Sequence, residues 1–369
     1  MRQAVRLLGV ALVTGLLASC SQLGPSVPGQ VRVEAPANAS PSAGPPVLAA
    51  AKATSTQLGV QIFWHDVNDA WSVQNNAGRL LDYTVSLGAN SVGISFPIYT
   101  DGVRPTRVYT KDGTTPTPES LQALIKAAKA RGLRVLIRPL LDEKNIATTP
   151  GAWRGSIEPR NMAGWFDSYL AAITPFLSSS QAAGADTFVV GAELDSLVGQ
   201  ATQWTKVLTA AAGTFHGQLS YADNWGAWAT GRPGVAGAVP GLDAYPQLHL
   251  GDSATVPALT DAWANWFKKR PAELTSTVVQ EVGIAATPGA YKLPAGWAST
   301  GQRVDPQIQA KWFAAACGAV KALGMPGIYF WNLDAWAEPA KASTYEPGSF
   351  IGRGDAAIKE CFASGWPGQ

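Results

Sequence analysis

Histidine is scarce in this chain of 369 residues, with His65, His216 and His249 as its three copies. They lie far apart, without the His-x-His or His-x-x-x-His spacing that lets two side chains of one strand or helix bind zinc. A metal-dependent hydrolase is therefore disfavoured. We expect neither a metal nor a cofactor.

Charge is also sparse, since charged residues make up 15% of the chain and the net charge is +2. A nucleic-acid-binding protein would need a strong positive field, so that class is disfavoured. Methionine is rare as well, with three copies against 14 tryptophans. Tryptophan offers a large flat face of the kind on which sugar rings stack, so this imbalance is the more informative one.

The three cysteines divide into one near the start, Cys20, and two near the end, Cys317 and Cys361. A basic start and an apolar run over 7–18 precede Cys20; the run is too short to span a bilayer. Residues 1–19 resemble a bacterial lipoprotein signal, which implies that Cys20 is lipidated. The alternative is an ordinary signal peptide with an incidental cysteine. We expect an exported lipoprotein, held at the membrane of the bacterial cell envelope through this lipid.

Residues 20–55 are rich in Pro, Ala, Ser and Gly and have almost no large apolar residue. Such a segment buries too little surface to offset the entropy of ordering it, so it predicts a flexible linker. Residues 56–369 then form a single domain, expected to be monomeric. Export to an oxidising compartment permits a disulfide between Cys317 and Cys361, but a buried thiol at Cys317 is an equal alternative.

Strand and helix patterns alternate through the domain. Helical spacing is clearest where Thr117, Asn161 and Asp305 can cap helices, whereas the helix between the fifth and sixth strands is weak or missing. Apolar runs predict eight strands, at 59–64, 92–96, 133–138 (stopped by Pro139), 187–193, 218–221, 241–244, 276–280 and 327–331. Continuously apolar strands of this number predict an α/β fold, a single (β/α)8 TIM barrel. A doubly wound open sheet is disfavoured because no Gly-rich phosphate loop follows the first strand.

Polar or aromatic side chains occur at the end of nearly every predicted strand. In a parallel barrel these ends meet at one mouth, where active sites lie. The set comprises His65, Asp66, Arg138, Asp142, Glu143, Glu193, Tyr221, Asp223, Asn224, Asp243, Tyr245, Glu281, Trp331, Asn332 and Asp334. Glu193 and Glu281 are the pair that glycosidic-bond cleavage needs, with carboxyls about 5–5.5 Å apart in a retaining enzyme.

Five short motifs resemble glycoside hydrolase family 113, the β-mannanase family. They are Gly191-Ala-Glu193-Leu194, Leu219-Ser-Tyr221-Ala-Asp-Asn224-Trp225, Leu242-Asp-Ala-Tyr245-Pro246, Glu281-Val-Gly283 and Phe330-Trp331-Asn332. The resemblance covers most of 57–335. It implies Glu193 as general acid/base, Glu281 as nucleophile, Tyr245 as a hydrogen-bond donor to Glu281, and Trp331 as the floor under the sugar. Asn224 and Trp225 would line the same cleft.

The sequence departs from the wider clan at Ala192, where many members carry an Asn that contacts the sugar 2-hydroxyl. Arg138 or Asn224 could take over that contact. Further candidates for substrate binding are Trp64, His65, Tyr221 and Asp334. Tryptophans predicted in mouth loops, of which about half are expected to pack instead, are Trp64, Trp153, Trp228, Trp297 and Trp336. Asp142 and Glu143 are either a rival acid pair or, by the simpler interpretation, solvated charges.

These patterns together predict a retaining glycoside hydrolase that cleaves a β-linked polysaccharide, with β-mannan first. The alternative is a barrel lipoprotein that has lost turnover and serves as a glycan-binding or envelope-structural protein. Ala192 favours the alternative, whereas the intact set of Glu193, Glu281, Tyr245 and Trp331 favours the enzyme. The identity of the sugar and the choice between endo and exo action stay open.

Overall fold

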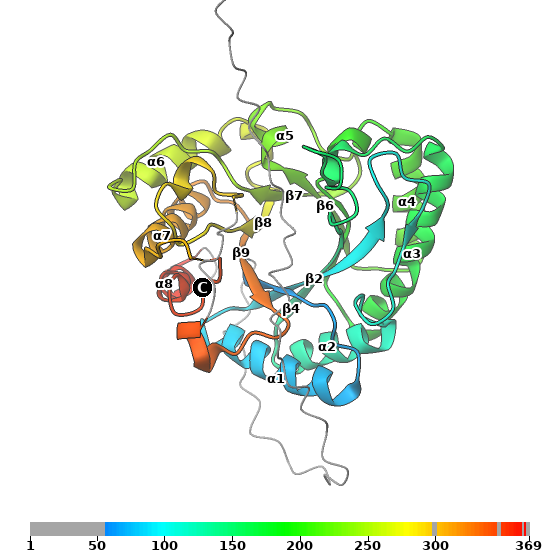
Figure 1. The fold of residues 1–369 in the computed structure, drawn as a ribbon, viewed down its shortest axis with the longest axis horizontal. Helices are drawn as coiled ribbons and strands as arrows, with labels where there is room; N and C mark the ends of the chain where they lie inside the picture. Colours follow the sequence, from blue (N-terminus) through cyan, green and yellow to red (C-terminus); the bar gives the residue numbers. More distant parts are fainter. Residues whose placement is uncertain (1–55, 297–300, 345–347, 364, 367–369) are drawn as a thin grey trace, which may run out of the picture.

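The computed structural model describes residues 56–296, 301–344, 348–363 and 365–366. The predicted signal peptide, Cys20, the linker and Trp297 lie outside these ranges. Within them, the chain forms a ring of helices around a central sheet (Figure 1).

The sheet is a closed barrel of eight parallel strands in the described residues. They follow the order β1-β9-β8-β7-β6-β5-β4-β2, and pairing of β1 with β2 closes the ring. A two-residue strand, β3 (Val108–Tyr109), adds to β2 in the antiparallel sense. The barrel strands are β1 (Gln57–Phe63), β2 (Ser91–Thr100), β4 (Arg134–Leu141), β5 (Thr187–Ala192), β6 (Gln218–Asn224), β7 (Val239–Ala244), β8 (Val278–Val282) and β9 (Gly327–Asp334). The predicted (β/α)8 barrel is confirmed.

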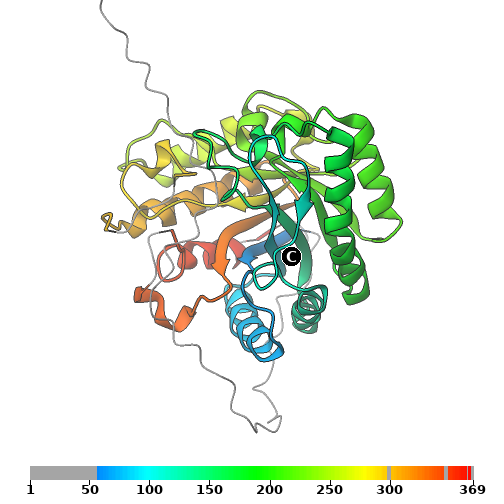
Figure 2. The ribbon, with the colours of Figure 1, turned by 45° about the vertical axis from the view of Figure 1, so that its right-hand side comes forward.

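Helices cover the outside of the barrel, with the long α3 along one side of it (Figure 2). The α-helices are α1 (Ala70–Ser86), α2 (Pro118–Ala130), α3 (Met162–Ala183), α4 (Ala201–Ala212), α5 (Trp225–Ala229), α6 (Val256–Phe267), α7 (Pro306–Ala322) and α8 (Asp355–Ala363). Short 3-10 turns lie at η1 (Arg154–Ser156), η2 (Asp195–Leu197), η3 (Pro271–Glu273), η4 (Ala290–Lys292) and η5 (Pro339–Thr344). The unit between β6 and β7 holds only the five-residue α5, as its Gly- and Pro-rich sequence indicated.

Local chemistry starts the main helices where the sequence predicted. The side chains of Thr117, Asn161 and Asp305 each accept a hydrogen bond from a backbone N–H of the first turn. Such caps satisfy donors that have no partner inside the helix. On α2, Leu121 and Leu124 are among the residues that bury one face of the helix against the barrel.

Several strands extend further than predicted, and for the third of them the difference bears on the site. Pro139 does not stop the third barrel strand, because β4 continues to Leu141 and stays in register with β2 along its length. Pairing of β4 with β5 is confined to Leu136 and Ile137, so the absent N–H of Pro139 interrupts no ladder there. Arg138 therefore lies inside the strand instead of at its end.

The barrel interior contains a polar layer. Gln61 donates to the backbone oxygen of Gln280 at 2.8 Å, and the Gln280 side chain donates to Ser220 at 2.7 Å. A Cβ atom at Gly241 would collide with the Gln280 side chain, so glycine gives this layer its room. Beneath the mouth, the strands are thus linked by side-chain hydrogen bonds as well as by packing.

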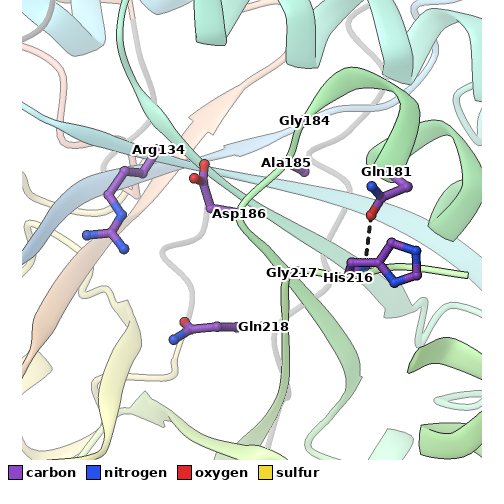
Figure 3. A pocket seen from close by; sticks show the side chains of 8 residues that line it. All are labelled: Arg134, Gln181, Gly184, Ala185, Asp186, His216, Gly217 and Gln218. Carbon is purple, nitrogen blue, oxygen red and sulfur yellow. Dashed lines mark hydrogen bonds between the residues drawn. The ribbon is translucent and has the colours of Figure 1, made fainter. Parts of the chain in front are cut away.

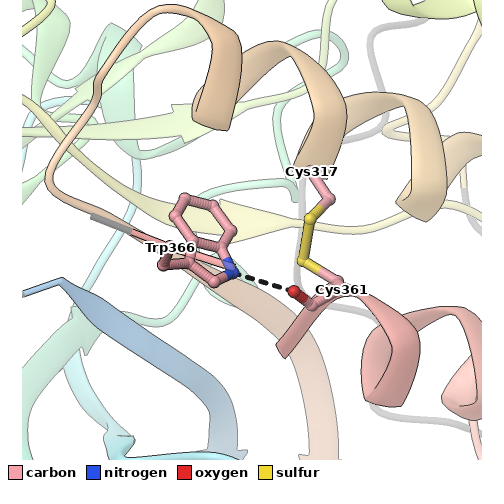
Figure 4. The surroundings of a disulfide bond; sticks show 3 residues. All are labelled: Cys317, Cys361 and Trp366. Carbon is pink, nitrogen blue, oxygen red and sulfur yellow. Dashed lines mark hydrogen bonds between the residues drawn. A yellow bond between two sulfur atoms is a disulfide. The ribbon is translucent and has the colours of Figure 1, made fainter. Parts of the chain in front are cut away.

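Cys317 on α7 and Cys361 on α8 form a disulfide, with Cα atoms 5.9 Å apart (Figure 4). This settles the two alternatives left open by the sequence in favour of the bridge. The indole N–H of Trp366 donates to the backbone oxygen of Cys361 at 2.8 Å, which holds the end of the chain against the same corner. The bridge lies in the helix layer, away from the polar residues of the barrel mouth.

Candidate active site

Glu193 follows β5 directly and is buried, with 2% of its surface exposed. Its backbone has φ of 56°, in the left-handed region that residues other than glycine rarely adopt. Such a conformation costs of order 1–3 kcal/mol and persists where the surroundings hold it. Here the Glu193 N–H donates to the backbone oxygen of Ala222 at 2.9 Å, so the turn is fixed to β6.

Two side chains contact the two carboxyl oxygens of Glu193. Asn224 donates from Nδ2 to Oε1 at 2.8 Å, and its own Oδ1 caps α5 by accepting from Gly226. Arg154 places Nη1 3.7 Å from Oε2. The Arg154 guanidinium is itself held by Glu143, whose Oε1 accepts from Nε at 2.9 Å.

The environment of Glu193 favours its protonated form. Burial raises its pKa, the nearby Arg154 lowers it, and the charges of Glu281 and Glu143 raise it again, to a net value of about 7. The influence of Glu281 shows that the two carboxyls lie within electrostatic reach of each other. A carboxyl with a pKa near neutrality can both give and take a proton under physiological conditions.

Glu281 is the fourth residue of β8 and has 3% of its surface exposed. Tyr245 donates from Oη to Oε2 at 2.7 Å, and Arg138 contacts Oε1 through Nη1. Both carboxylate oxygens are therefore held by donors, one neutral and one cationic. The hydrogen bond from Tyr245 predicted by the family resemblance is confirmed.

Arg138 is completely buried, so the prediction that it contacts substrate is wrong. It bridges Glu281 and Asp243 instead, through Nη1 and Nη2. A buried guanidinium is stable only when carboxylates neutralise it, and these two supply that charge. Arg138 thus supports the site from below.

Aromatic rings surround the two glutamates. Trp331 lies on β9 with its ring centroid 5.9 Å from that of Phe63. On the other side, the ring of Trp225 packs edge-on against Tyr245 at 5.4 Å, and Trp153 lies 6.4 Å from Trp225. These rings give the mouth apolar walls next to its carboxyls.

Gly283 makes the close approach of two of these residues possible. A Cβ atom there would lie 3.0 Å from Tyr245 Oη and 3.4 Å from Trp331 Cβ. A side chain at this position would push the tyrosine away from Glu281. The motif Glu281-Val-Gly283 therefore has a steric reason.

His65 forms a bridge between two carboxylates at the ends of β1 and β9. Its Nδ1 lies 2.8 Å from Asp66 Oδ2 and its Nε2 lies 2.8 Å from Asp334 Oδ2. Burial lowers the pKa of His65, but the hydrogen bonds and charges of Asp334 and Asp66 outweigh it and raise the pKa to about 9. The imidazole is therefore cationic at neutral pH and donates from both nitrogens.

Two predicted substrate contacts are wrong because of strand alternation. Trp64 is fully buried and packs with Val60 and Ile62 against the helices, while its indole donates to the backbone oxygen of Val67. Tyr221 packs against Trp204 at 5.3 Å, and its Oη accepts from the backbone N–H of Leu194 at 2.9 Å. Successive residues of a strand face opposite sides, so neither ring reaches the mouth.

Other expectations have mixed outcomes. Trp228 is buried in the core, whereas Trp336 is exposed and Trp153 half-buried. Asp142 and Glu143 are buried, so the interpretation as solvated charges is wrong. Arg154, the partner of Glu143, was not singled out from the sequence. It lies on a loop without periodicity, and an arginine there carries no local signal.

The described residues contain no group of three or more His, Cys, Asp or Glu side chains placed to hold a metal ion. Among the same residues, no helix is both long and apolar enough to span a bilayer.

A hollow of about 540 Å³ opens at the opposite end of the barrel from the glutamates (Figure 3). Arg134 and Gln218 are the first residues of β4 and β6, and Asp186 precedes β5, so these side chains surround the amino ends of the strands. Barrel enzymes carry their chemistry at the carboxyl ends. The hollow is therefore separate from the candidate active site.

A (β/α)8 barrel with two carboxyls in different environments and aromatic walls at its mouth has the features of a glycoside hydrolase. The model of Glycoside Hydrolase Family 113 matches residues 61–348. The chain belongs to this family and is a glycoside hydrolase. No protein with a curated description matches it.

Solved structures with similar folds agree with this assignment. One, described as the structure of a GH113 β-1,4-mannanase, is 16% identical, with a TM-score of 0.70, over 84% of this chain and 99% of its own. The β-mannanase AaManA from Alicyclobacillus acidocaldarius, in complex with ManMIm, is also 16% identical, with a TM-score of 0.68, over 84% and 97%. A GH5_18 protein from Streptomyces cattleya in complex with GlcNAc is 14% identical, with a TM-score of 0.54, over 86% and 82%.

Proposed function

We propose that this protein hydrolyses a β-linked polysaccharide with retention of configuration, and that the substrate is β-1,4-mannan. The observation that carries the proposal is the difference between the two glutamates. Glu193 has a pKa of about 7, raised above all by burial, whereas Glu281 has both oxygens held by Arg138 and Tyr245. Two carboxyls in environments as different as these suit different roles, Glu193 as the acid and Glu281 as the nucleophile.

In the first step, Glu281 attacks the anomeric carbon while Glu193 gives its proton to the departing oxygen. The glycosidic bond breaks, a bond from the Glu281 oxygen to the sugar forms, and the aglycone leaves as an alcohol. In the second step, Glu193 takes a proton from water, and the water oxygen displaces Glu281 from the anomeric carbon. The released hemiacetal has the configuration of the substrate.

The surroundings of each carboxyl suit these steps. Glu281 keeps its donors throughout, so its orientation does not depend on the sugar. Glu193 alternates between a protonated form and a carboxylate, and Asn224 and Arg154 supply donors to the carboxylate. Mannan is proposed because similar structures in the family are described as β-1,4-mannanases.

Incubation of residues 56–369 with mannan, glucan and xylan tests the proposal. We expect reducing ends to appear with mannan and to disappear in Glu281→Ala, and proton NMR of the first products to show the β-anomer. Hydrolysis of glucan or xylan without hydrolysis of mannan would contradict the proposal that mannan is the substrate. Initial formation of the α-anomer would reject the retaining mechanism.

A second candidate is a glycan-binding protein without turnover. It is favoured by Ala192, which precedes Glu193 and cannot hydrogen-bond the sugar 2-hydroxyl. Calorimetric binding of mannotriose, with no hydrolysis of any β-glycan in the panel between pH 4 and 9, would select this candidate.

We also propose that the protein is an exported lipoprotein, anchored through Cys20. The basis is the sequence alone, with an apolar run that ends in Leu-Ala-Ser-Cys. In a bacterial host, Cys20→Ala is expected to move the protein from the membrane fraction to the soluble fraction. An unchanged distribution would contradict the anchor.

A further inference from the structure

Asp243 is a fully buried carboxyl to which the two proposed steps assign no role. It is the fifth residue of β7, where it lies in register with Asn224 of β6 on one side and with Glu281 of β8 on the other. Its Oδ2 contacts Nη2 of Arg138, which reaches it from β4 across the barrel interior. A third carboxyl thus lies directly between the residue that contacts Glu193 and the proposed nucleophile.

One guanidinium serves two carboxyls in this layer. Arg138 contacts Glu281 through Nη1 and Asp243 through Nη2, and at most 4% of any of these three side chains is exposed. Asp243 Oδ1 and Arg138 Nε have no hydrogen-bond partner within the described part of the chain, so the ion pairs hold this layer together. A buried cation needs at least one anion, and two anions are one more than neutrality requires.

The surroundings of Glu193 repeat this arrangement. Arg154 is 1% exposed and lies between Glu193, whose Oε2 is 3.7 Å from Nη1, and Glu143, whose Oε1 accepts from Nε at 2.9 Å. Each of the two glutamates therefore shares a buried arginine with a second buried carboxyl that makes no bond to the sugar in the proposed steps. Because β4 and the η1 turn supply the two arginines separately, the repetition favours a requirement of the reaction over local packing.

The first proposed step moves a negative charge from one arrangement to the other. When Glu281 attacks the anomeric carbon, its carboxylate becomes a neutral ester, and Glu193 becomes a carboxylate as its proton passes to the leaving oxygen. Arg138 thereby loses one of its two anions in a fully buried layer. Without a second carboxylate the guanidinium would be left as an unpaired buried charge, which is strongly unfavourable.

We infer that Asp243 is a positioning residue for the covalent step and acts through Arg138. It keeps the guanidinium neutralised while Glu281 is an ester. Before the attack, it shares the charge of Arg138, so the guanidinium does not stabilise the Glu281 carboxylate at the expense of its reactivity. Both effects favour the glycosyl-enzyme over the free carboxylate. The inference rests on the proposed function.

The electrostatics of Asp243 agree with this role. Burial raises its pKa well above the usual range against the opposing charge of Arg138, and the charge of Glu281 adds to the rise. Formation of the ester removes the charge of Glu281 and with it that part of the rise. Asp243 is therefore more readily ionised in the glycosyl-enzyme, the state in which Arg138 depends on it.

A dinitrophenyl 2-deoxy-2-fluoro-β-mannobioside separates formation of the glycosyl-enzyme from its breakdown, since dinitrophenolate leaves without a proton and the fluorinated ester is long-lived. Intact-mass spectrometry follows formation, and recovery of activity after removal of the reagent follows breakdown. We expect Asp243→Asn to lower the ratio of the formation rate to the breakdown rate about tenfold or more, as for coupled groups of one ion-pair network. A structural role would slow both steps alike, so an unchanged or increased ratio would overturn the inference.

Asp223→Asn is the matched control. Asp223 lies on the neighbouring strand β6, is 4% exposed and contacts Nη1 of Arg270, so it is also a buried carboxyl paired with an arginine. It precedes Asn224 and therefore faces the opposite side of the strand. The ratio of rates should not change in this variant. A fall equal to that of Asp243→Asn would show that any buried ion pair has this effect and would overturn the specific role of Asp243.

Thermal unfolding tests the charge accounting without turnover. Asp243→Asn and Glu281→Gln each leave Arg138 one of its two carboxylates, whereas the double variant leaves it neither. We expect the double variant to lower the thermal midpoint by more than the two single variants added together, because only it leaves the cation unpaired. Additive losses, or an Asp243→Asn variant that does not fold, would overturn the inference. A wild type that forms no adduct with the fluorinated reagent would instead reject the retaining mechanism, while this measurement still decides the charge accounting.

Discussion

Tyr245 donates a hydrogen bond of 2.7 Å from Oη to Oε2 of Glu281, and these two residues come from adjacent barrel strands or their ends. Arg138 contacts the other carboxylate oxygen. The carboxylate is thereby fixed from two sides before any sugar binds. Preorganisation of this kind is a main source of catalytic power in enzymes, because no reorientation is needed during the reaction.

Tyr245→Phe should lower kcat on mannan about 10- to 100-fold. The phenyl ring keeps its packing against Trp225, but Oε2 of Glu281 loses its donor, and a hydrogen bond to a charged group contributes about 1.5–3 kcal/mol. Initial rates of reducing-end release measure the effect. The thermal midpoint of unfolding should stay close to that of the wild type. A variant with unchanged kcat would show that the hydrogen bond has no catalytic role.

Arg138→Met should destabilise the fold as well as abolish activity. It leaves Asp243 and Glu281 buried without their cation, and removal of one partner from a buried ion pair costs about 3–5 kcal/mol. Thermal unfolding followed by circular dichroism measures the loss. Adding Asp243→Leu to Arg138→Met should restore part of the stability, because it removes one of the unpaired charges. A double variant less stable than the single would contradict this account.

Much of the barrel and the placement of the two candidate catalytic glutamates was predictable from local patterns. Apolar runs gave the eight strands, and caps such as Thr117 gave helix starts. The positions of Glu193 and Glu281 follow from the rule that parallel strands bring their carboxyl ends to one mouth. These features depend on residues close together in the chain.

The errors came where facing direction or distant packing decides. Val60 and Ile62 face the helices, and side chains alternate along a strand. Alternation therefore places Trp64 on the helix side and His65 at the mouth. Pro139 predicts that the strand ends at Arg138, because proline lacks the N–H of a strand residue, but β4 continues to Leu141. Arg154 reaches Glu193 from a loop between β4 and α3, and only the folded chain brings the two together.

Reduction of the disulfide should lower stability and spare catalysis. Cys317 and Cys361 are 44 residues apart, and closing a loop of that length contributes about 4 kcal/mol in the chain-entropy description. The double variant Cys317→Ala with Cys361→Ala should unfold at a lower temperature while keeping kcat/KM near the wild-type value. A large loss of kcat/KM well below the unfolding temperature would show that the bridge reaches the active site.

The pH dependence of kcat/KM should show a descending limb above about pH 7. Burial raises the pKa of Glu193 to about 7, and only its protonated form can donate to the leaving oxygen, so the rate falls as the pH rises through that value. Each further pH unit should lower the rate about tenfold. An aryl mannoside with a dinitrophenyl leaving group needs no proton and serves as the control, for which this limb should vanish.

Two variants of the Glu143–Arg154 pair should move the descending limb of the kcat/KM profile in opposite directions. Arg154 lowers the pKa of Glu193 and Glu143 raises it, so Arg154→Gln should move the descending limb to higher pH and Glu143→Gln to lower pH. Each profile is measured at a temperature at which circular dichroism shows the variant folded. A purely structural pair would lower the rate at every pH without moving the limb, and a shift of both variants in one direction would refute the electrostatic role.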